Sequence, residues 1–262
     1  MIAWIRIFLV LASLALVTFV LLPVQIAALA FDWRLRRYIP RLWHRAACRL
    51  VGIRVRAHGR PETRRPLLLA SNHVSWKDIL VLGAVADVVY IAKAEVRGWP
   101  VFGILARLQA TIFVEREQKR KTGEKVDEIG RRLSDGEIVV LFPEGTTSDG
   151  NRLLEVKTSL FGAAASAAAM TADGIVHIQP VAISYTGIHG MAMGRYHRPL
   201  AGWPGDIPLG SHLLAILKEG AIEVDVDFGE RIDYRRDSNR KAISREVEAA
   251  IRRMLSSRLR GR

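Results

Sequence analysis

The stretch Leu67-Leu68-Leu69-Ala70-Ser71-Asn72-His73-Val74-Ser75-Trp76-Lys77-Asp78 contains a strand and the first part of a candidate site. Its first four residues form a short apolar run after a proline, which is typical of a buried strand. The apolar residues after Asp78 indicate a buried helix, with Ser75 as its cap and Asp78 in its first turn. His73 therefore lies in a loop between a strand and a helix.

The spacing of His73 and Asp78 suits a pair that moves a proton. A carboxylate in a first helical turn is kept ionised by the helix dipole, and it can reach back to an imidazole that precedes the helix. One ring nitrogen then binds the carboxylate, and the other can take a proton from a substrate hydroxyl. A loop histidine beside an ordinary capping carboxylate gives the same pattern, so a second motif has to separate the two interpretations.

The composition is that of one large α/β domain with a full core, because the chain has 262 residues and 50% of them are hydrophobic. The formal net charge of +13 requires nucleic acid, an anionic membrane surface or an anionic substrate as a partner. Cys48 is the only cysteine, which excludes an intrachain disulfide and indicates a reducing, cytoplasmic setting. We interpret this cysteine as structural.

Residues 1–30 predict a membrane segment, since no charged residue occurs from Ile7 to Phe31. From Phe31 to Arg65 there are eleven arginines and only two acids, a charge excess that resists translocation and favours the cytoplasmic side. We therefore expect the segment to be retained and not cleaved as a signal peptide. It either spans the bilayer or, because Pro23 and a nearby glutamine interrupt it, is half-inserted.

The segment from Trp33 to Gly52 predicts a basic amphipathic helix. Arginines alternate with apolar residues at helical spacing, apart from a break at Pro40. Trp and Tyr side chains in such a helix favour the boundary between lipid and water, and the position after an apolar segment supports that placement. A solvated basic helix that packs on the domain is the alternative.

Short strand-like runs alternate with helical segments along the rest of the chain. Strands are expected at 53–57, 67–70, 88–91, 110–114, 138–142, 176–183 and 222–228, and helices at 79–84, 98–108, 122–134, 157–170, 209–219 and from 238 onward. This order predicts an α/β fold with a mostly parallel central sheet flanked by helices. Residues 185–208 are expected to form a loop, and Pro180 indicates an edge strand or a strand end.

Parallel packing of these strands gathers polar residues at one edge of the sheet. Four of them directly follow predicted strands: His73, Lys93, Arg116 and Glu144. Loops at the carboxyl ends of parallel strands carry the site in such sheets. We therefore expect these four side chains to lie close together.

The second motif is Phe142-Pro143-Glu144-Gly145-Thr146-Thr147-Ser148, which leaves the most apolar predicted strand and turns at once. Gly145 permits a backbone that is strained for other residues, and the turn amides and hydroxyls form a donor-rich pocket. Glu144 in such a pocket could accept hydrogen bonds from a substrate hydroxyl. Taken alone, the same residues could form a simple turn.

Together the two motifs are specific. Asn72-His73-x-Ser75-x-x-Asp78, followed about seventy residues later by Phe142-Pro143-Glu144-Gly145-Thr146, resembles the lysophospholipid and glycerolipid acyltransferase family. The size and the anchor resemble those of bacterial 1-acyl-glycerol-3-phosphate acyltransferases. The resemblance covers roughly residues 50–230.

Two weaker motifs extend the resemblance. The family pattern Gly-x-x-Phe-x-x-Arg is matched by Ala110-Thr111-Ile112-Phe113-Val114-Glu115-Arg116, with Ala110 in place of the glycine. The apolar strand with a proline is matched by Ile178-Gln179-Pro180-Val181-Ala182-Ile183.

The resemblance implies a role for each matching residue. His73 is the expected general base, and Asp78 is the carboxylate that orients it. Arg116 is expected to bind the phosphate of the acceptor, and Glu144 with Gly145 to hold its glycerol part. The other residues expected at the substrate are Asn72, Ser75, Lys93, Thr146 and Pro180.

The implied reaction transfers a fatty acyl group from acyl carrier protein or coenzyme A to the sn-2 hydroxyl of 1-acyl-sn-glycerol-3-phosphate. The product is phosphatidic acid, an intermediate of phospholipid biosynthesis. Another lyso-lipid acceptor, such as lyso-ornithine lipid, and a non-catalytic lipid-binding protein on the same fold are the alternatives. No cofactor besides the acyl donor is expected, and no metal, because no second histidine stands at ligand spacing.

The expected partners are anionic membrane lipids, lysophosphatidic acid and the acyl thioester of carrier protein or coenzyme A. No nucleic acid is expected, because the basic residues cluster beside an apolar segment and no nucleic-acid motif is present. We expect an anchor and basic helix at residues 1–50 and an acyltransferase domain at residues 51–262. This domain is expected on the cytoplasmic side of the cytoplasmic membrane.

Overall fold

The computed structural model describes residues 1–114, 119–204 and 207–260, with side chains from Lys125 onward in the helix that begins at Lys119. Its strands are β1 Ile53–His58, β2 Leu67–Ser71, β3 Val88–Lys93, β4 Ile112–Val114, β5 Ile138–Leu141, β6 Ile175–Ile188, β7 Met191–Ala192, β8 Ile222–Phe228 and β9 Ile232–Arg235. Its helices are α1 Ile2–Ala30, α2 Leu35–Val51, α3 Lys77–Val85, η1 Ala94–Gly98, α4 Phe102–Leu108, α5 Lys119–Ser134, η2 Thr158–Phe161, α6 Gly162–Met170, η3 Arg198–Leu200, α7 Leu209–Glu219 and α8 Arg240–Leu259, where η marks a 3-10 helix.

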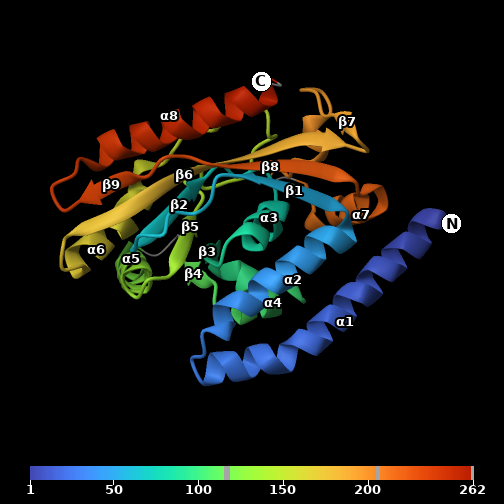
Figure 1. The fold of residues 1–262 in the computed structure, drawn as a ribbon, viewed down its shortest axis with the longest axis horizontal. Helices are drawn as coiled ribbons and strands as arrows, with labels where there is room; N and C mark the ends of the chain where they lie inside the picture. Colours follow the sequence, from blue (N-terminus) through green and yellow to red (C-terminus); the bar gives the residue numbers. More distant parts are fainter. Residues whose placement is uncertain (115–118, 205–206, 261–262) are drawn as a thin grey trace.

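One sheet organises the molecule, with the strand order β1-β8-β6-β2-β5-β3-β4 and with β7 and β9 paired to β6 (Figure 1). The strands β6, β2, β5, β3 and β4 are parallel neighbours, whereas β8 and β9 run antiparallel to β6. Helices cover both faces of the sheet. The predicted α/β class with a mostly parallel sheet is therefore confirmed.

The strand β2 lies at the centre because its side chains are apolar on both faces. Leu67 and Leu69 belong to the core that α3 covers, and Leu68 and Ala70 belong to the core that α6 and α8 cover. All four are completely buried. Such a strand is stable only between two covered faces, which places the loop after it in the middle of the sheet edge.

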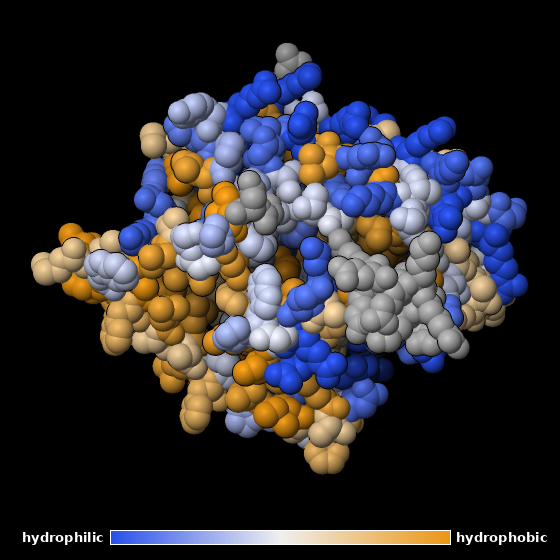
Figure 2. All heavy atoms as spheres, turned by 180° about the vertical axis from the view of Figure 1, so that it is seen from behind, coloured by the Kyte–Doolittle hydropathy of each residue, from blue (hydrophilic) through white to orange (hydrophobic). Residues whose placement is uncertain are grey.

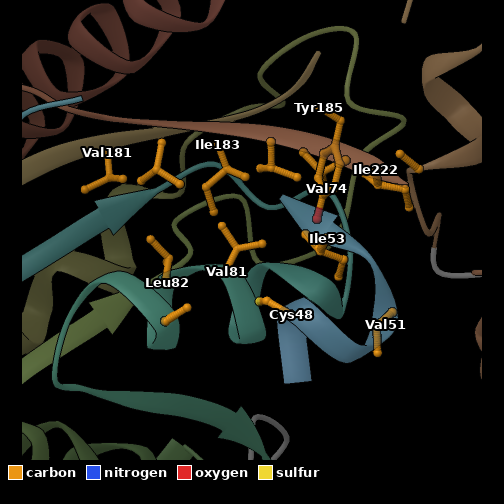
Figure 3. Packing of buried hydrophobic residues seen from close by; sticks show 14 of the residues in the cluster. Cys48, Val51, Ile53, Val74, Val81, Leu82, Val181, Ile183, Tyr185 and Ile222 are labelled. Carbon is orange, nitrogen blue, oxygen red and sulfur yellow. The ribbon is translucent and has the colours of Figure 1, made fainter. Parts of the chain in front are cut away.

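The core on the α3 side joins distant segments (Figure 3). Val81 of α3 and Cys48 of α2 face Ile183 and Tyr185 of β6. Burial raises the pKa of the Cys48 thiol to about 12, so this cysteine is an apolar packing group, in agreement with the structural interpretation.

Parallel packing gathers the polar loops as predicted. His73 follows β2, Glu144 follows β5 and Lys93 ends β3, and these three strands are neighbours in the order β2-β5-β3. They run in one direction, so their carboxyl ends share one edge of the sheet. Arg116 lies outside the described residues.

Pro180 was predicted at an edge or a strand end, and this was wrong. It lies inside β6, which is paired on both sides. On one side, the β9 ladder ends at Ile178 and the β8 ladder begins at Val181, so Pro180 falls between two partners. A residue without an N–H is tolerated there because no ladder bond on that side is lost.

The region after β6 also departs from the prediction. Residues 185–188 continue β6 and do not belong to a loop, and β9 was not predicted. Both errors arise because these strands are defined by pairing with β8 and β6, which lie elsewhere in the chain. By contrast, α7 and β8 have the predicted bounds.

The N-terminal helix α1 is continuous through Pro23. Its length and apolar composition would allow it to cross a membrane. It is fastened to the domain by Arg6, whose guanidinium donates to the carbonyl oxygens of Leu217 and Val51. The segment is therefore largely exposed and is attached to the α/β domain at its N-terminal end.

The basic helix α2 packs between α1 and α3. Arg41 and Arg45 donate to the carbonyl oxygens of Val85 and Ala84, at the C-terminal end of α3. These arginines thus cap α3, as in a basic helix that packs on the domain. Cys48 and Val51 lie on either side of the predicted boundary between anchor and domain, after residue 50, and both belong to the same core. That boundary stays a prediction.

Ala110 has a φ of +56°, in the left-handed region that favours glycine. This is the position where the family motif has glycine. We expect Ala110→Gly to raise the free energy of unfolding by about 1 kcal/mol, because the left-handed strain is removed. Urea denaturation followed by circular dichroism in detergent measures the change.

The matched control is Ala165→Gly, a half-buried alanine inside α6. It should lower the free energy of unfolding by about 1 kcal/mol, because glycine is unfavourable inside a helix. A loss of stability in Ala110→Gly equal to that in Ala165→Gly would contradict the backbone argument.

Candidate functional site

His73 lies in the loop between β2 and α3, and its Nδ1 is 2.8 Å from Oδ2 of Asp78. The Asp78 side chain is fully buried and the His73 side chain is 19% exposed. Because Nδ1 is bound to the carboxylate, Nε2 is the ring nitrogen left to take a proton. The contact that the five-residue spacing predicted is therefore present.

Asp78 accepts four hydrogen bonds, three from the loop between β2 and α3 and one from β6. Its Oδ2 also accepts the amides of Val74 and Ser75, at 2.6 and 2.9 Å. Its Oδ1 accepts the hydroxyl of Tyr185, at 2.8 Å. These donors give both oxygens of the buried carboxylate hydrogen-bond partners, and the first turn of α3 adds the positive end of the helix dipole.

Ser75 was predicted to cap α3, and this was wrong. The residue at the N-cap position is Trp76, and the Ser75 Oγ reaches the amide of Lys77 only at 3.4 Å. Asp78 takes the loop amides instead. The Ser75 Oγ lies closer, at 2.9 Å, to the ammonium group of Lys77.

Lys77 is fully buried behind the loop. Its Nζ donates to the Ser75 Oγ and, at 2.7 Å, to the carbonyl oxygen of Ala201. Burial lowers the pKa of Lys77 to about 7, and nearby Asp78 opposes this shift. Lys77 therefore ties the segment around Ala201 to the loop of His73.

Glu144 joins the second motif to the first. Its Oε1 accepts the amide of His73 at 2.6 Å, and its Oε2 accepts the amide of Leu154 at 2.7 Å. The amide of Ser148 returns a hydrogen bond to the carbonyl oxygen of His73, at 2.8 Å. Glu144 is 1% exposed, and this burial raises its pKa to about 7.

The expected contact of Glu144 with the acceptor stays a prediction. Both of its oxygens are occupied by backbone amides, so in this structure the carboxylate holds the loops in place. Gly145 has a φ of +71°, and an added Cβ would approach Nζ of Lys157 to 3.2 Å. Thr146 is exposed, whereas Thr147 donates its hydroxyl to the carbonyl oxygen of Trp203.

The other predicted substrate residues have different surroundings. Asn72 is buried and its side-chain amide pairs with the backbone of Ile183, at 2.9 and 2.7 Å. Lys93 is exposed at the end of β3. Pro180 is buried and lies opposite Ala70, inside the sheet. Asn72 therefore extends the joint between β2 and β6 beside the site.

Phe142 packs against the ring of His73. The imidazole of His73 stacks on the Phe142 ring, with centroids 4.0 Å apart and an interplanar angle of 16°. This apolar face leaves the ring edge with Nε2 for a substrate. The amides of His73, Val74 and Ser75 all have carboxylate partners, so an oxyanion needs donors from other residues.

The sequence did not reveal Tyr185, Lys77 or Trp203. Trp203 donates its amide to the carbonyl oxygen of Val74, at 2.8 Å. Tyr185 and Trp203 fall in the segment that was expected to be loop, and Lys77 has no local pattern that distinguishes it from a surface lysine. Among the described residues, no group of three or more His, Cys, Asp or Glu side chains could hold a metal ion.

A family model described as acyltransferase matches residues 53–184. The chain is 67% identical to a lyso-ornithine lipid O-acyltransferase of Rhizobium meliloti, over 100% of this chain and 90% of that protein. It is 51% identical to a protein of the same name from Brucella abortus, over 100% of this chain and 98% of that protein.

Other similar proteins are named for a different acceptor. The chain is 32% identical to a 1-acyl-sn-glycerol-3-phosphate acyltransferase of Neisseria gonorrhoeae, over 77% of this chain and 74% of that protein. The crystal structure of the 1-acyl-sn-glycerophosphate acyltransferase PlsC from Thermotoga maritima has the same fold. Its TM-score is 0.68 at 21% identity, over 99% of this chain and 98% of that chain.

The raised pKa of Glu144 predicts a pH dependence of stability. The carboxyl changes from an ordinary pKa of 4.5 to about 7 on folding, so between these values the folded state binds more protons than the unfolded state. The free energy of unfolding should therefore fall as the pH rises through this window. Glu144→Gln cannot titrate and should show a smaller fall in urea denaturation at pH 4.5 to 7.5.

Glu155→Gln is the control, because Glu155 is an exposed glutamate of the same loop. It should keep the pH dependence of the unchanged protein. Identical pH dependence in Glu144→Gln and Glu155→Gln would contradict the raised pKa of Glu144.

Proposed function

This chain belongs to the acyltransferase family and acylates lyso-lipids, and we propose that its acceptor is lyso-ornithine lipid. The identity of 67% to a lyso-ornithine lipid O-acyltransferase, over the whole chain, supports this acceptor. The prediction from sequence motifs put 1-acyl-sn-glycerol-3-phosphate first and lyso-ornithine lipid second. We reverse that order because the relative with the phosphate acceptor is only 32% identical.

1-Acyl-sn-glycerol-3-phosphate is the second candidate acceptor. Its phosphate would suit the guanidinium of Arg116, which resembles the phosphate-binding arginine of the family. The head group of lyso-ornithine lipid is an amino acid and carries no phosphate. The two acceptors thus make different demands on the same site, and a direct comparison of their turnover separates them.

The proposed reaction is a direct acyl transfer. Nε2 of His73 takes the proton of the acceptor hydroxyl as the oxygen attacks the thioester carbonyl carbon. The tetrahedral intermediate collapses with cleavage of the carbon–sulfur bond, and the imidazolium returns its proton to the thiolate of the leaving group. The contact of His73 with Asp78 carries this proposal, because it stabilises the imidazolium and directs Nε2 outward.

The acyl donor is proposed to be the thioester of acyl carrier protein or of coenzyme A. Neither donor requires a metal or another cofactor in this mechanism. A histidine–aspartate contact alone does not separate an enzyme from a non-catalytic lipid-binding protein, because His58 and Asp225 form one as well. The identity of 67% to an O-acyltransferase over the whole chain favours the enzyme.

We place α1 and the start of α2 at the cytoplasmic face of the membrane. Large apolar side chains of α1 are exposed along most of its length, and Phe31, Trp33 and Tyr38 continue this surface. In Figure 2 hydrophobic residues gather on the side of the molecule where α1 lies. Basic residues near anionic head groups contribute about 1 kcal/mol each, which would add to this attachment.

The acceptor is tested with purified protein, both acyl donors, and lyso-ornithine lipid against 1-acyl-sn-glycerol-3-phosphate. We expect kcat/KM to be about tenfold or more higher for lyso-ornithine lipid, a difference of about 1.4 kcal/mol between the two transition states. Release of the free thiol of the donor measures turnover. Preference for the phosphate acceptor would overturn the proposed acceptor and leave the acyltransferase activity intact.

The role of His73 is tested by His73→Ala. Loss of the general base should lower kcat by about 100- to 10,000-fold, while the protein remains folded and binds vesicles like the unchanged protein. His58→Ala is the matched control, since His58 forms a second histidine–aspartate pair, with Asp225 at 2.7 Å, between β1 and β8. His58→Ala should retain activity, and substantial turnover by His73→Ala would exclude the mechanism.

Tyr185 is expected to position Asp78. Tyr185→Phe should lower kcat by about tenfold and leave KM nearly unchanged, because a hydrogen bond to a charged group is lost. Tyr90→Phe is the control, because the buried hydroxyl of Tyr90 also donates to α3, to the carbonyl oxygen of Ile79 at 2.7 Å. Tyr185→Phe should lose about 2 kcal/mol of stability and Tyr90→Phe about 1 kcal/mol, because only Tyr185 binds a carboxylate, and equal activities would contradict the positioning role.

A further inference from the structure

The segment that follows β3 exposes apolar side chains at an unusual place. Trp99 is 36% exposed, Val101 is 64% exposed and Ile104 is 53% exposed. They lie in the turn between η1 and α4 and in the first turn of α4. A water-soluble surface rarely groups large apolar residues in so short a stretch, so this grouping calls for a partner.

The backbone reinforces this exposure. Val101 has a φ of +61°, in the left-handed region that is costly for a β-branched residue. The preceding Pro100 and the start of α4 hold it there, with the amide of Leu105 donating to the Val101 carbonyl oxygen at 3.0 Å. The turn thus presents its apolar side chain outward at a conformational cost, which marks candidate binding segments.

The helix α4, which follows the turn, is fixed to the N-terminal helices at its C-terminal end. Nε2 of Gln25 in α1 donates to the carbonyl oxygen of Leu108, at 2.6 Å, where α4 ends. Gln109 binds the ring of His44 in α2, at 2.9 Å. Leu105 and Leu108 line a small cavity against α1 and α2, and Ile104 is exposed. The apolar surface of α1 therefore continues onto α4.

Charges around the turn favour an anionic surface. Lys93, Arg97 and Arg107 are exposed in the same segment, with Glu95 as the one exposed acid. Apolar side chains surrounded by a basic excess are typical of proteins that insert shallowly into anionic bilayers. The charge pattern and the continuity with α1 therefore select a lipid bilayer as the occupant.

We propose that the turn from Trp99 to Ile104 is a second membrane contact, which docks the entrance of the site on an anionic bilayer. This rests on the proposed function. Only η1 separates the turn from β3, whose carboxyl end lies at the sheet edge that carries His73 and Glu144.

A fluorescent probe at residue 101 tests the contact without turnover. Cys48 is the only cysteine and is 3% exposed, so an environment-sensitive dye (NBD) attached to Val101→Cys reports from the turn alone. Met191→Cys is the matched control, because Met191 is 65% exposed and lies in β7, at the top of Figure 1 and away from α1 and α4.

Vesicles of phosphatidylglycerol and phosphatidylethanolamine should shift the emission at residue 101 to the blue, brighten it several-fold and protect it from iodide. The emission at residue 191 should not change. Sedimentation with the vesicles verifies binding of both labelled proteins. The proposal is overturned if the emission at residue 101 does not change on addition of vesicles, or if the protein does not bind them. A shift of that emission caused by soluble acyl carrier protein without lipid would also overturn it.

A kinetic experiment gives a second measurement. Val101→Ser with Ile104→Ser should raise the apparent KM for an acceptor presented in vesicles by about tenfold, and leave kcat unchanged. The same variant should match the unchanged protein when the acceptor is dispersed in detergent. Met191→Ser should behave like the unchanged protein in both assays. An unchanged KM on vesicles in the double variant contradicts the docking role, whereas absence of turnover in the unchanged protein would refute the proposed function alone.

Discussion

The buried carboxylate of Asp78 is the group on which the rest of the site depends. Donors from the loop after β2, from the imidazole of His73 and from β6 converge on its two oxygens. A buried charge without such partners is strongly destabilising, so the loop, the start of α3 and the end of β6 are stable only when assembled around it. The same bonds fix the tautomer and the direction of the imidazole. Stability and catalytic geometry thus have a common source.

Glu144 extends this arrangement to the second motif. Its carboxylate accepts the amide of His73 and, on its other oxygen, the amide of Leu154. The family resemblance implies that Glu144 binds the substrate, whereas in the structure both of its oxygens bind backbone amides. Glu144, which follows β5, thus fixes the loop of His73 relative to the turn at Gly145. A group that acts in this way needs burial more than access to solvent, and Glu144 is 1% exposed.

The N-terminal helix α2 also binds the helix that carries Asp78. The helix α3 carries Asp78 in its first turn, and its last carbonyl groups are capped by Arg41 and Arg45 of α2. The helix that carries Asp78 therefore ends against α2, which with α1 carries the exposed apolar surface. The position of α3 relative to α1 and α2 is therefore fixed. Arg41 and Arg45 are partly buried because they bind the end of α3.

Local patterns determined much of this protein. The α7 helix and the β8 strand have the predicted bounds, because apolar periodicity and a stop at Gly220 act over a few residues. The contact of His73 with Asp78 follows from a five-residue spacing at a helix start. Only the tertiary structure decided the place of Pro180 inside β6, the backbone partners of Glu144 and the hydrogen bond from Tyr185 to Asp78. Tyr185 lies 107 positions from Asp78, and Glu144 lies 71 positions from His73. No local pattern can encode a hydrogen bond whose two groups meet only when the sheet has brought their strands together.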